Sequence, residues 1–68
     1  MIFGERLKEL RTERKISQME LAKATGISQS AIAKWELGRT EPTASALIKL
    51  SVYFSESVDY LLGVEQNV

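Results

Sequence analysis

The 68-residue sequence contains no cysteine and no histidine, and only one proline. Without cysteine no disulfide can form, and without cysteine and histidine a zinc site of the ordinary kind is excluded. The same two absences remove the usual nucleophile–base pairs of enzymes, and the sequence has no glycine-rich phosphate loop. We therefore expect no metal, no cofactor and no enzymatic activity.

Long hydrophobic runs are also missing. No apolar stretch approaches the roughly 18 residues that a membrane-spanning helix needs, and the amino terminus lacks the pattern of a signal peptide. Hydrophobic residues nevertheless make up 44% of the chain, which suits a small helical bundle near the lower size limit for a core without disulfides. We expect a soluble, cytoplasmic, all-α protein with one domain over residues 1–63, a short tail over residues 64–68 and no membrane partner.

Apolar spacing predicts the first helix. Phe3, Leu7 and Leu10 follow an i, i+4, i+7 pattern, which indicates a helix over residues 3–14 with one apolar stripe. Arg14 and Lys15 are expected to place positive charge in its last turn, where the helix dipole favours it.

Capping residues predict four further helices. Ser17, followed three residues later by Glu20, predicts a capping box for a second helix over residues 18–25. A third helix is expected to start at Ser28 and to end at Gly38. Thr43 caps a fourth helix over Ala44–Phe54, whose inward residues are expected to be Leu47, Leu50, Ser51 and Phe54. Ser57 caps a fifth helix over Val58–Leu62, which Gly63 ends.

The second and third expected helices meet at a tight corner. Gly26 follows the second helix, and glycine takes a left-handed conformation there without a side-chain penalty. Ala22 is small enough for two helices to cross closely, and Ile27 is expected to point inward. A short turn containing glycine between two short helices is the helix-turn-helix signature.

The chain resembles the lambda-repressor and Cro-type (XRE-like) helix-turn-helix family over nearly its whole length. This resemblance implies a compact five-helix bundle whose second and third helices form the helix-turn-helix, and a protein that binds DNA. The residues that carry it are Ser17–Ala22, Gly26–Ser30, Ile32, Trp35, Glu36, Gly38, Arg39, Pro42, Leu47, Leu50 and Val58–Gly63.

Two residues depart from the family pattern. The family usually has glycine where this chain has Ser55, and an apolar residue where it has Glu56. A serine held at positive φ carries strain, and Glu56 removes an apolar contact in front of the fifth helix.

The charge distribution permits a nucleic-acid partner. The nine basic and nine acidic residues cancel. Residues 1–39 nevertheless hold eight basic and five acidic residues, a net charge of +3, and residues 40–68 hold one basic and four acidic, a net charge of −3. A solvated surface with a chance asymmetry explains the same numbers, so charge alone does not decide.

One face of the third helix is the candidate DNA reader, because Ile32 and Trp35 lie on its opposite side. The amino-terminal residues of such a helix enter the major groove. Gln29 matches the N6/N7 edge of adenine, and Ser30 suits several base edges. Ala33 suits a thymine methyl group, and Lys34 suits guanine or a phosphate.

Other residues are expected to contact phosphates, because helix amino termini and cations bind anions. The candidates are Gln18, Thr43 and Ala44 at helix starts and Arg39 in a loop, and the resemblance adds Arg11. The resemblance further implies that Gln18 braces Gln29 and that Arg11 pairs with Glu36 beside the DNA backbone. The alternative for that pair is an ordinary surface ion pair worth about 0–1 kcal/mol.

The fifth helix carries more apolar residues than one short helix buries. Val58, Tyr60, Leu61 and Leu62 are therefore candidate dimer contacts, although some of them are alternatively needed to close the core over the first helix. Family members commonly dimerise on DNA.

The resemblance favours a sequence-specific regulator of bacterial or phage origin, a repressor that binds a (pseudo)palindromic double-stranded DNA operator as a homodimer through the major groove. The alternative is an antitoxin-like or other protein-interaction module on the same fold, with an unidentified protein partner.

Overall fold

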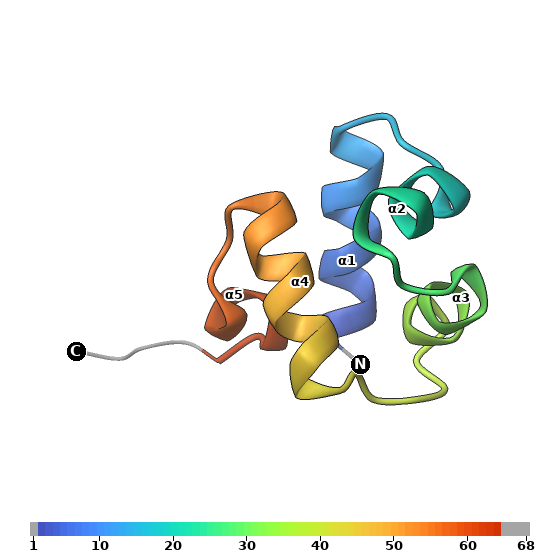
Figure 1. The fold of residues 1–68 in the computed structure, drawn as a ribbon. Coiled ribbons are helices and arrows are strands. Elements are labelled where there is room, and N and C mark those ends of the chain that lie inside the picture. Colours follow the sequence, from blue (N-terminus) through green and yellow to red (C-terminus); the bar gives the residue numbers. More distant parts are fainter. Residues whose placement is uncertain (1, 65–68) are drawn as a thin grey trace.

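The computed structural model describes residues 2–64 and shows five helices joined by short corners (Figure 1). The expected all-α architecture is confirmed, and no strand occurs in the described part of the chain. Residues 65–68 of the predicted tail lie outside it, and the predicted boundary between domain and tail stays a prediction. The helices are α1 (Ile2–Glu13), α2 (Gln18–Thr25), α3 (Gln29–Glu36), α4 (Ala44–Phe54) and α5 (Val58–Leu62).

The bundle is arranged around α1. In Figure 1, α2 and α3 lie on one side of α1, while α4 and α5 lie on the other. α1 packs on α3 and α5, and α4 packs on α2 and α5. Of the helices within residues 2–64, none has the length and apolarity that crossing a membrane requires.

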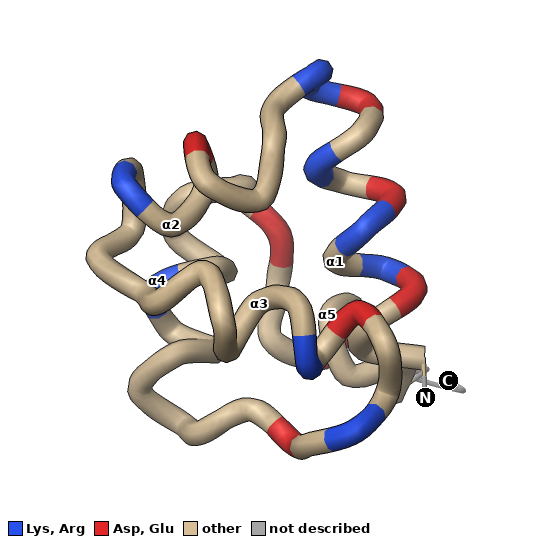
Figure 2. Tube along the Cα trace, turned by 90° about the vertical axis from the view of Figure 1, so that its right-hand side faces the viewer, with Lys and Arg blue, Asp and Glu red and all other residues tan. Residues whose placement is uncertain are grey.

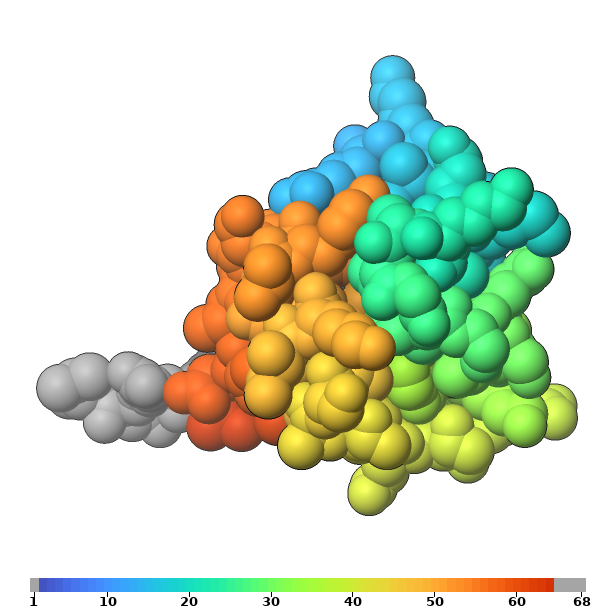
Figure 3. All heavy atoms as spheres, in the orientation of Figure 1, coloured from blue at the N-terminus to red at the C-terminus, as the bar shows by residue number. Residues whose placement is uncertain are grey.

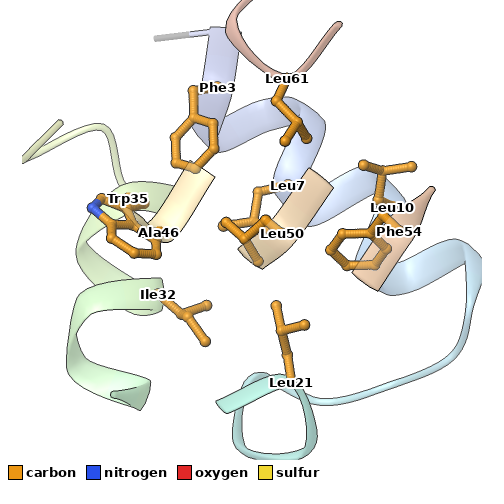
Figure 4. Close-up of a cluster of buried hydrophobic side chains, with 10 residues drawn as sticks. All are labelled: Phe3, Leu7, Leu10, Leu21, Ile32, Trp35, Ala46, Leu50, Phe54 and Leu61. Carbon is orange, nitrogen blue, oxygen red and sulfur yellow. The ribbon is translucent and has the colours of Figure 1, made fainter. Parts of the chain in front are cut away.

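The core is apolar throughout. Within the described residues no polar or charged residue is buried when its backbone and side chain are counted together. All five helices contribute to the buried cluster (Figure 4), which consists of Phe3, Leu7, Leu10, Leu21, Ile32, Trp35, Ala46, Leu50, Phe54 and Leu61.

The buried stripe of α4 corrects the sequence prediction. The helix buries Ala46, Leu50 and Phe54, while Leu47 and Ser51 are only half-buried. Leu50 and Phe54 are buried as predicted and Leu47 packs against the core, but the prediction missed Ala46, which lies beside Trp35 in Figure 4. A side chain as small as alanine lets α4 lie close to the indole ring, and hydrophobicity counts along the sequence do not register that benefit.

Gly4 sets how closely α1 approaches α3. It is buried, and a Cβ atom there would overlap the backbone carbonyl oxygen of Trp35. Next to this contact, the rings of Phe3 and Trp35 pack edge to face with centroids 5.7 Å apart. The sequence analysis did not single out Gly4, because the need for a missing side chain arises from a distant segment.

Side-chain caps open the last four helices as predicted. The hydroxyl groups of Ser17, Ser28, Thr43 and Ser57 each accept a hydrogen bond from the backbone N–H three residues later, at 3.0–3.1 Å. The capping box of α2 is complete, because the backbone N–H of Ser17 donates to the Glu20 carboxylate at 2.8 Å.

Three helix-to-helix corners share one plan: a left-handed residue, an intervening residue and a serine cap. The left-handed residues are Lys15 (φ 57°), Gly26 (φ 76°) and Ser55 (φ 55°). The expected positive φ of Ser55 is confirmed. The expectation for Arg14 and Lys15 was wrong, because α1 ends at Glu13 and both residues lie in the turn that follows.

Two arginines of the α1 region bind the carboxyl ends of other helices. Arg14 donates to the carbonyl oxygens of Tyr53 (3.1 Å) and Phe54 (2.9 Å), and Arg6 donates to that of Tyr60 (2.7 Å). The last carbonyls of a helix have no partner within it, so a cation there satisfies both hydrogen bonding and the dipole.

Charge alternates along α1, as the coloured Cα trace shows (Figure 2). Because Arg6 and Arg14 donate to backbone carbonyls of α5 and α4, part of the basic excess of residues 1–39 also stabilises the fold.

Candidate nucleic-acid interface

The corner between α2 and α3 is built as the sequence predicts. Gly26 is left-handed (φ 76°, ψ 9°), and its N–H donates to the carbonyl oxygen of Ala22 at 2.9 Å. The hydroxyl of Thr25 donates to the Leu21 carbonyl (2.7 Å) and accepts from the N–H of Ile27 (3.3 Å). The turn is thus closed by local bonds on both sides of the glycine.

The α3 helix has one buried and one open face. Ile32 is fully buried, and Trp35 is 5% exposed. Gln29, Ser30 and Lys34 are exposed and Ala33 is half-buried. We call these four residues the outer face of α3. The bundle's own helices do not cover it, and α3 lies at the edge of the molecule in Figure 1.

A cluster of polar side chains ties α1, α2 and α3 together behind this face. The Nε and NH2 groups of Arg11 donate to the two carboxylate oxygens of Glu36 at 2.8 and 2.9 Å, and NH1 donates to the Ile16 carbonyl at 3.0 Å. The predicted Arg11–Glu36 pair is confirmed. Its side chains are only 13% and 5% exposed, so the alternative of an ordinary surface ion pair fails.

The side chain of Gln18 has a different partner from the one expected. Its amide donates to Glu36 at 3.1 Å, where the resemblance implied a bond that braces Gln29. A carboxylate is a stronger acceptor than a side-chain amide. Gln18 therefore completes the cluster and fixes the start of α2 against the end of α3.

Both charged members of the cluster are shifted toward their ionised forms. Burial raises the pKa of Glu36, but hydrogen bonds from Arg11 and Gln18 and the positive charges of Arg11 and Lys8 outweigh it, so the pKa falls below its ordinary value. The hydrogen bond to Glu36 raises the pKa of Arg11, against a smaller opposing effect of burial. The pair is therefore ionised at neutral pH.

The remaining phosphate candidates lie at loop and helix starts. Arg39 is exposed directly after the α3 turn, and Thr43 and Ala44 are exposed at the start of α4. The Thr43 side chain binds the N–H of Ala46, and other N–H groups of this first turn have no partner within the helix. Among residues 2–64, no three acidic side chains gather into a group that could hold a metal ion.

The α5 residues divide between core and surface. Leu61 is fully buried, so its candidacy as a dimer contact was wrong: it closes the core over α1. Val58 is half-buried, and Tyr60 and Leu62 are 37% and 40% exposed. Leu62 lines a surface hollow of about 300 Å³ together with Glu41, Pro42 and Leu47.

Comparison with protein families assigns the chain. A helix-turn-helix family model matches residues 7–61. The chain belongs to the helix-turn-helix family. This confirms the resemblance to the Cro and lambda-repressor type.

Named relatives of this helix-turn-helix chain are transcription regulators. The repressor protein C2 of Salmonella phage P22 is 43% identical over 61 residues, which are 90% of this chain and 28% of that protein. The HTH-type transcriptional activator BcrR of Enterococcus faecalis is 39% identical over 68 residues, which are all of this chain and 33% of that protein. The chain spans 33–57% of the length of the first three curated relatives that it matches.

A solved structure agrees in fold. The crystal structure of the P22 c2 repressor protein in complex with synthetic operator 9T, in the presence of Tl⁺, matches with a TM-score of 0.87 and 40% identity. The match covers 96% of this chain and 98% of that chain.

One residue beside the outer face of α3 lacks a role in the sequence analysis. Leu37, directly after the helix, is 68% exposed. The helical period places Leu37 on the same side as Ala33. A leucine at a periodic position more often indicates a core residue, so Leu37 was given no surface role.

Proposed function

We propose that this chain is a cytoplasmic transcription regulator that binds double-stranded DNA in the major groove and represses by occupying an operator. The observation that carries the proposal is the outer face of α3, whose polar residues are open while Ile32 and Trp35 anchor the helix in the core. Support comes from the relatives, which are named as helix-turn-helix regulators and repressors, and from the solved relative with its synthetic operator.

The outer face of α3 reads the bases. Gln29 donates to and accepts from the adenine edge, and Ser30 bonds a neighbouring base. Ala33 contacts a thymine methyl group. Lys34, one turn further along the helix, binds guanine or a phosphate.

Phosphate contacts set the register of the domain on the duplex. Exposed N–H groups at the start of α4, around Thr43 and Ala44, bind one phosphate, and Arg39 binds by charge. Gln18 and Arg11 bind from the cluster behind α3. Three of the five Arg11 N–H groups donate hydrogen bonds to Glu36 and Ile16, and the other two donate to a phosphate oxygen.

Two copies bind together. Val58, Tyr60 and Leu62 supply apolar contacts, and the hollow beside Leu62 accepts side chains of the second copy. In such a dimer the two recognition helices lie about 34 Å apart, one turn of DNA. A homodimer on a (pseudo)palindromic operator follows from this spacing.

Selection of bound sequences from a random DNA pool tests the proposal. We expect a (pseudo)palindromic consensus with an adenine at the Gln29 position. Gln29→Ala should weaken binding to the selected site by about 1–3 kcal/mol and relax the preference at that base pair.

Arg39→Ala is the matched contrast, because Arg39 is proposed to contact phosphate alone. The variant should weaken binding to all sequences alike. It should also lower the slope of log K against log salt concentration by about one, the contribution of one released counterion. A pool without enrichment would refute the proposal, and an unchanged preference in Gln29→Ala would remove Gln29 from the readers.

A further inference from the structure

A second open surface lies where α2 meets α4. This groove of about 360 Å³ is lined by Ala24, Thr25, Ile48, Lys49, Val52 and Tyr53, and we call it the α2–α4 groove. Its aliphatic part is uncovered, since Ile48 is 60% and Val52 75% exposed. Figure 3 shows this face, with the blue-green atoms of α2 beside the yellow and orange atoms of α4.

The shape of the α2–α4 groove suits a helix. Ile48 and Val52 are one turn apart on α4 and therefore share a face. Opposite them, α2 contributes Ala24 and Thr25, whose short side chains leave the groove open. Grooves of this kind bind an amphipathic helix through apolar side chains spaced by one turn.

The charged residue in the lining of the α2–α4 groove is positive. Lys49 belongs to the lining, and no carboxylate does. The Arg14 guanidinium lies 5.6 Å from the centroid of the Tyr53 ring, at the edge of the groove. The Glu20 carboxylate of α2 binds the N–H of Ser17 at the opposite end of that helix. A partner with acidic residues therefore complements this surface.

We propose that the α2–α4 groove binds an acidic amphipathic helix of another protein. Two aliphatic side chains one turn apart contact Ile48 and Val52, and a carboxylate lies beside Lys49. None of the groove residues is among the proposed DNA contacts. The site is therefore separate from the outer face of α3 and does not depend on the proposed function.

Two synthetic helical peptides of about 15 residues serve as probes. They share one leucine stripe, which is flanked by glutamates in the first and by lysines in the second. Amide shifts of the ¹⁵N-labelled chain measure their binding. We expect the acidic peptide to bind about fivefold more tightly, as one exposed ion pair allows, with shifts centred on Ala24, Ile48 and Val52. Lys49→Glu should reverse the preference.

Val52→Lys should weaken binding of the acidic peptide at least about tenfold. Val64→Lys is the matched control, because Val64 is 55% exposed and lies outside the groove; its affinity should not change. Thermal melting checks that both variants fold. Equal affinities for the two peptides, or binding that survives Val52→Lys, would overturn the proposal. Amide shifts at the groove that grow with protein concentration in the absence of peptide would also overturn the proposal, because they identify a second copy of the chain as the occupant.

Discussion

The corners Gly26–Ile27–Ser28 and Ser55–Glu56–Ser57 follow the same backbone plan with different chemistry. Both place a left-handed residue between two helices and cap the second helix with serine. In the first corner the left-handed residue is glycine and the next is an isoleucine that packs against the core. In the second they are a strained serine and a glutamate. The residues of the first corner therefore favour its backbone conformation themselves.

Neighbouring segments hold the second corner instead. The Ser51 hydroxyl donates to the Glu56 carbonyl at 2.6 Å, and Arg14 donates to the carbonyls of Tyr53 and Phe54. These bonds fix the end of α4 where the local sequence does not favour it. The corner that presents the outer face of α3 has the locally consistent sequence, and the corner before α5 depends on contacts made across the fold.

The largest expected effect is at Glu36, which ties α2 and α3 to α1 through Gln18 and Arg11. Glu36→Gln leaves Arg11 without its charged partner and should lower the free energy of unfolding by about 1.5–3 kcal/mol, as for hydrogen bonds to charged groups. Urea unfolding measures it. Glu41→Gln, at an exposed loop position, is the control and should change little; equal stability of the two variants would show that the cluster contributes nothing.

The same pair predicts a pH dependence. The folded pKa of Glu36 is lowered, so its stabilisation is complete above the unfolded pKa of about 4.3 and is lost as pH falls through the folded value. The difference between wild type and Glu36→Gln should therefore shrink on acidification below about pH 4.3. Melting temperatures from pH 7 to pH 2 measure it. A difference independent of pH would contradict the lowered pKa.

Gly26→Ala tests the first corner directly. No atom lies within 4 Å of a Cβ placed there, so the change acts only through the left-handed backbone. We expect a loss of about 1–2 kcal/mol, measured by thermal unfolding. A variant as stable as wild type would mean that the glycine is not what makes this corner favourable.

Ser55→Gly should have the smallest effect and the opposite sign. Glycine relieves the strain at φ 55°, and the expected gain is about 0.5–1 kcal/mol after the entropy of the unfolded chain is counted. Ser55→Ala is the control and should be near neutral, since alanine retains a Cβ atom. A Ser55→Gly variant less stable than wild type would show that the serine side chain has a role of its own.

Local signals predicted the helices well. Serine and threonine caps gave α2, α4 and α5 their observed bounds, and Gly26 marked the corner before α3. These signals work because a cap bonds to a backbone group three residues away. The strain at Ser55 was predictable from the resemblance, because the family usually has glycine at that position.

Long-range features escaped prediction. Arg14 binds carbonyls 39 and 40 residues away, and nothing near Arg14 in the sequence indicates that partner. The burial of Ala46 and of Leu61 depends on how neighbouring helices pack. For the candidate site, the Arg11–Glu36 pair came from family resemblance, and the capture of Gln18 by that pair became visible only in three dimensions.

The contact at Gly4 has a consequence for binding. With no side chain between them, the backbone of α1 lies directly against the last turn of α3 and restrains that helix in the unbound chain. Under the proposed function, a helix that is restrained in advance loses little conformational entropy on binding DNA, so the proposed contacts of Gln29 and Lys34 contribute more fully to affinity. A larger residue at position 4 would weaken this restraint on α3, although Gly4 is not among the proposed DNA contacts.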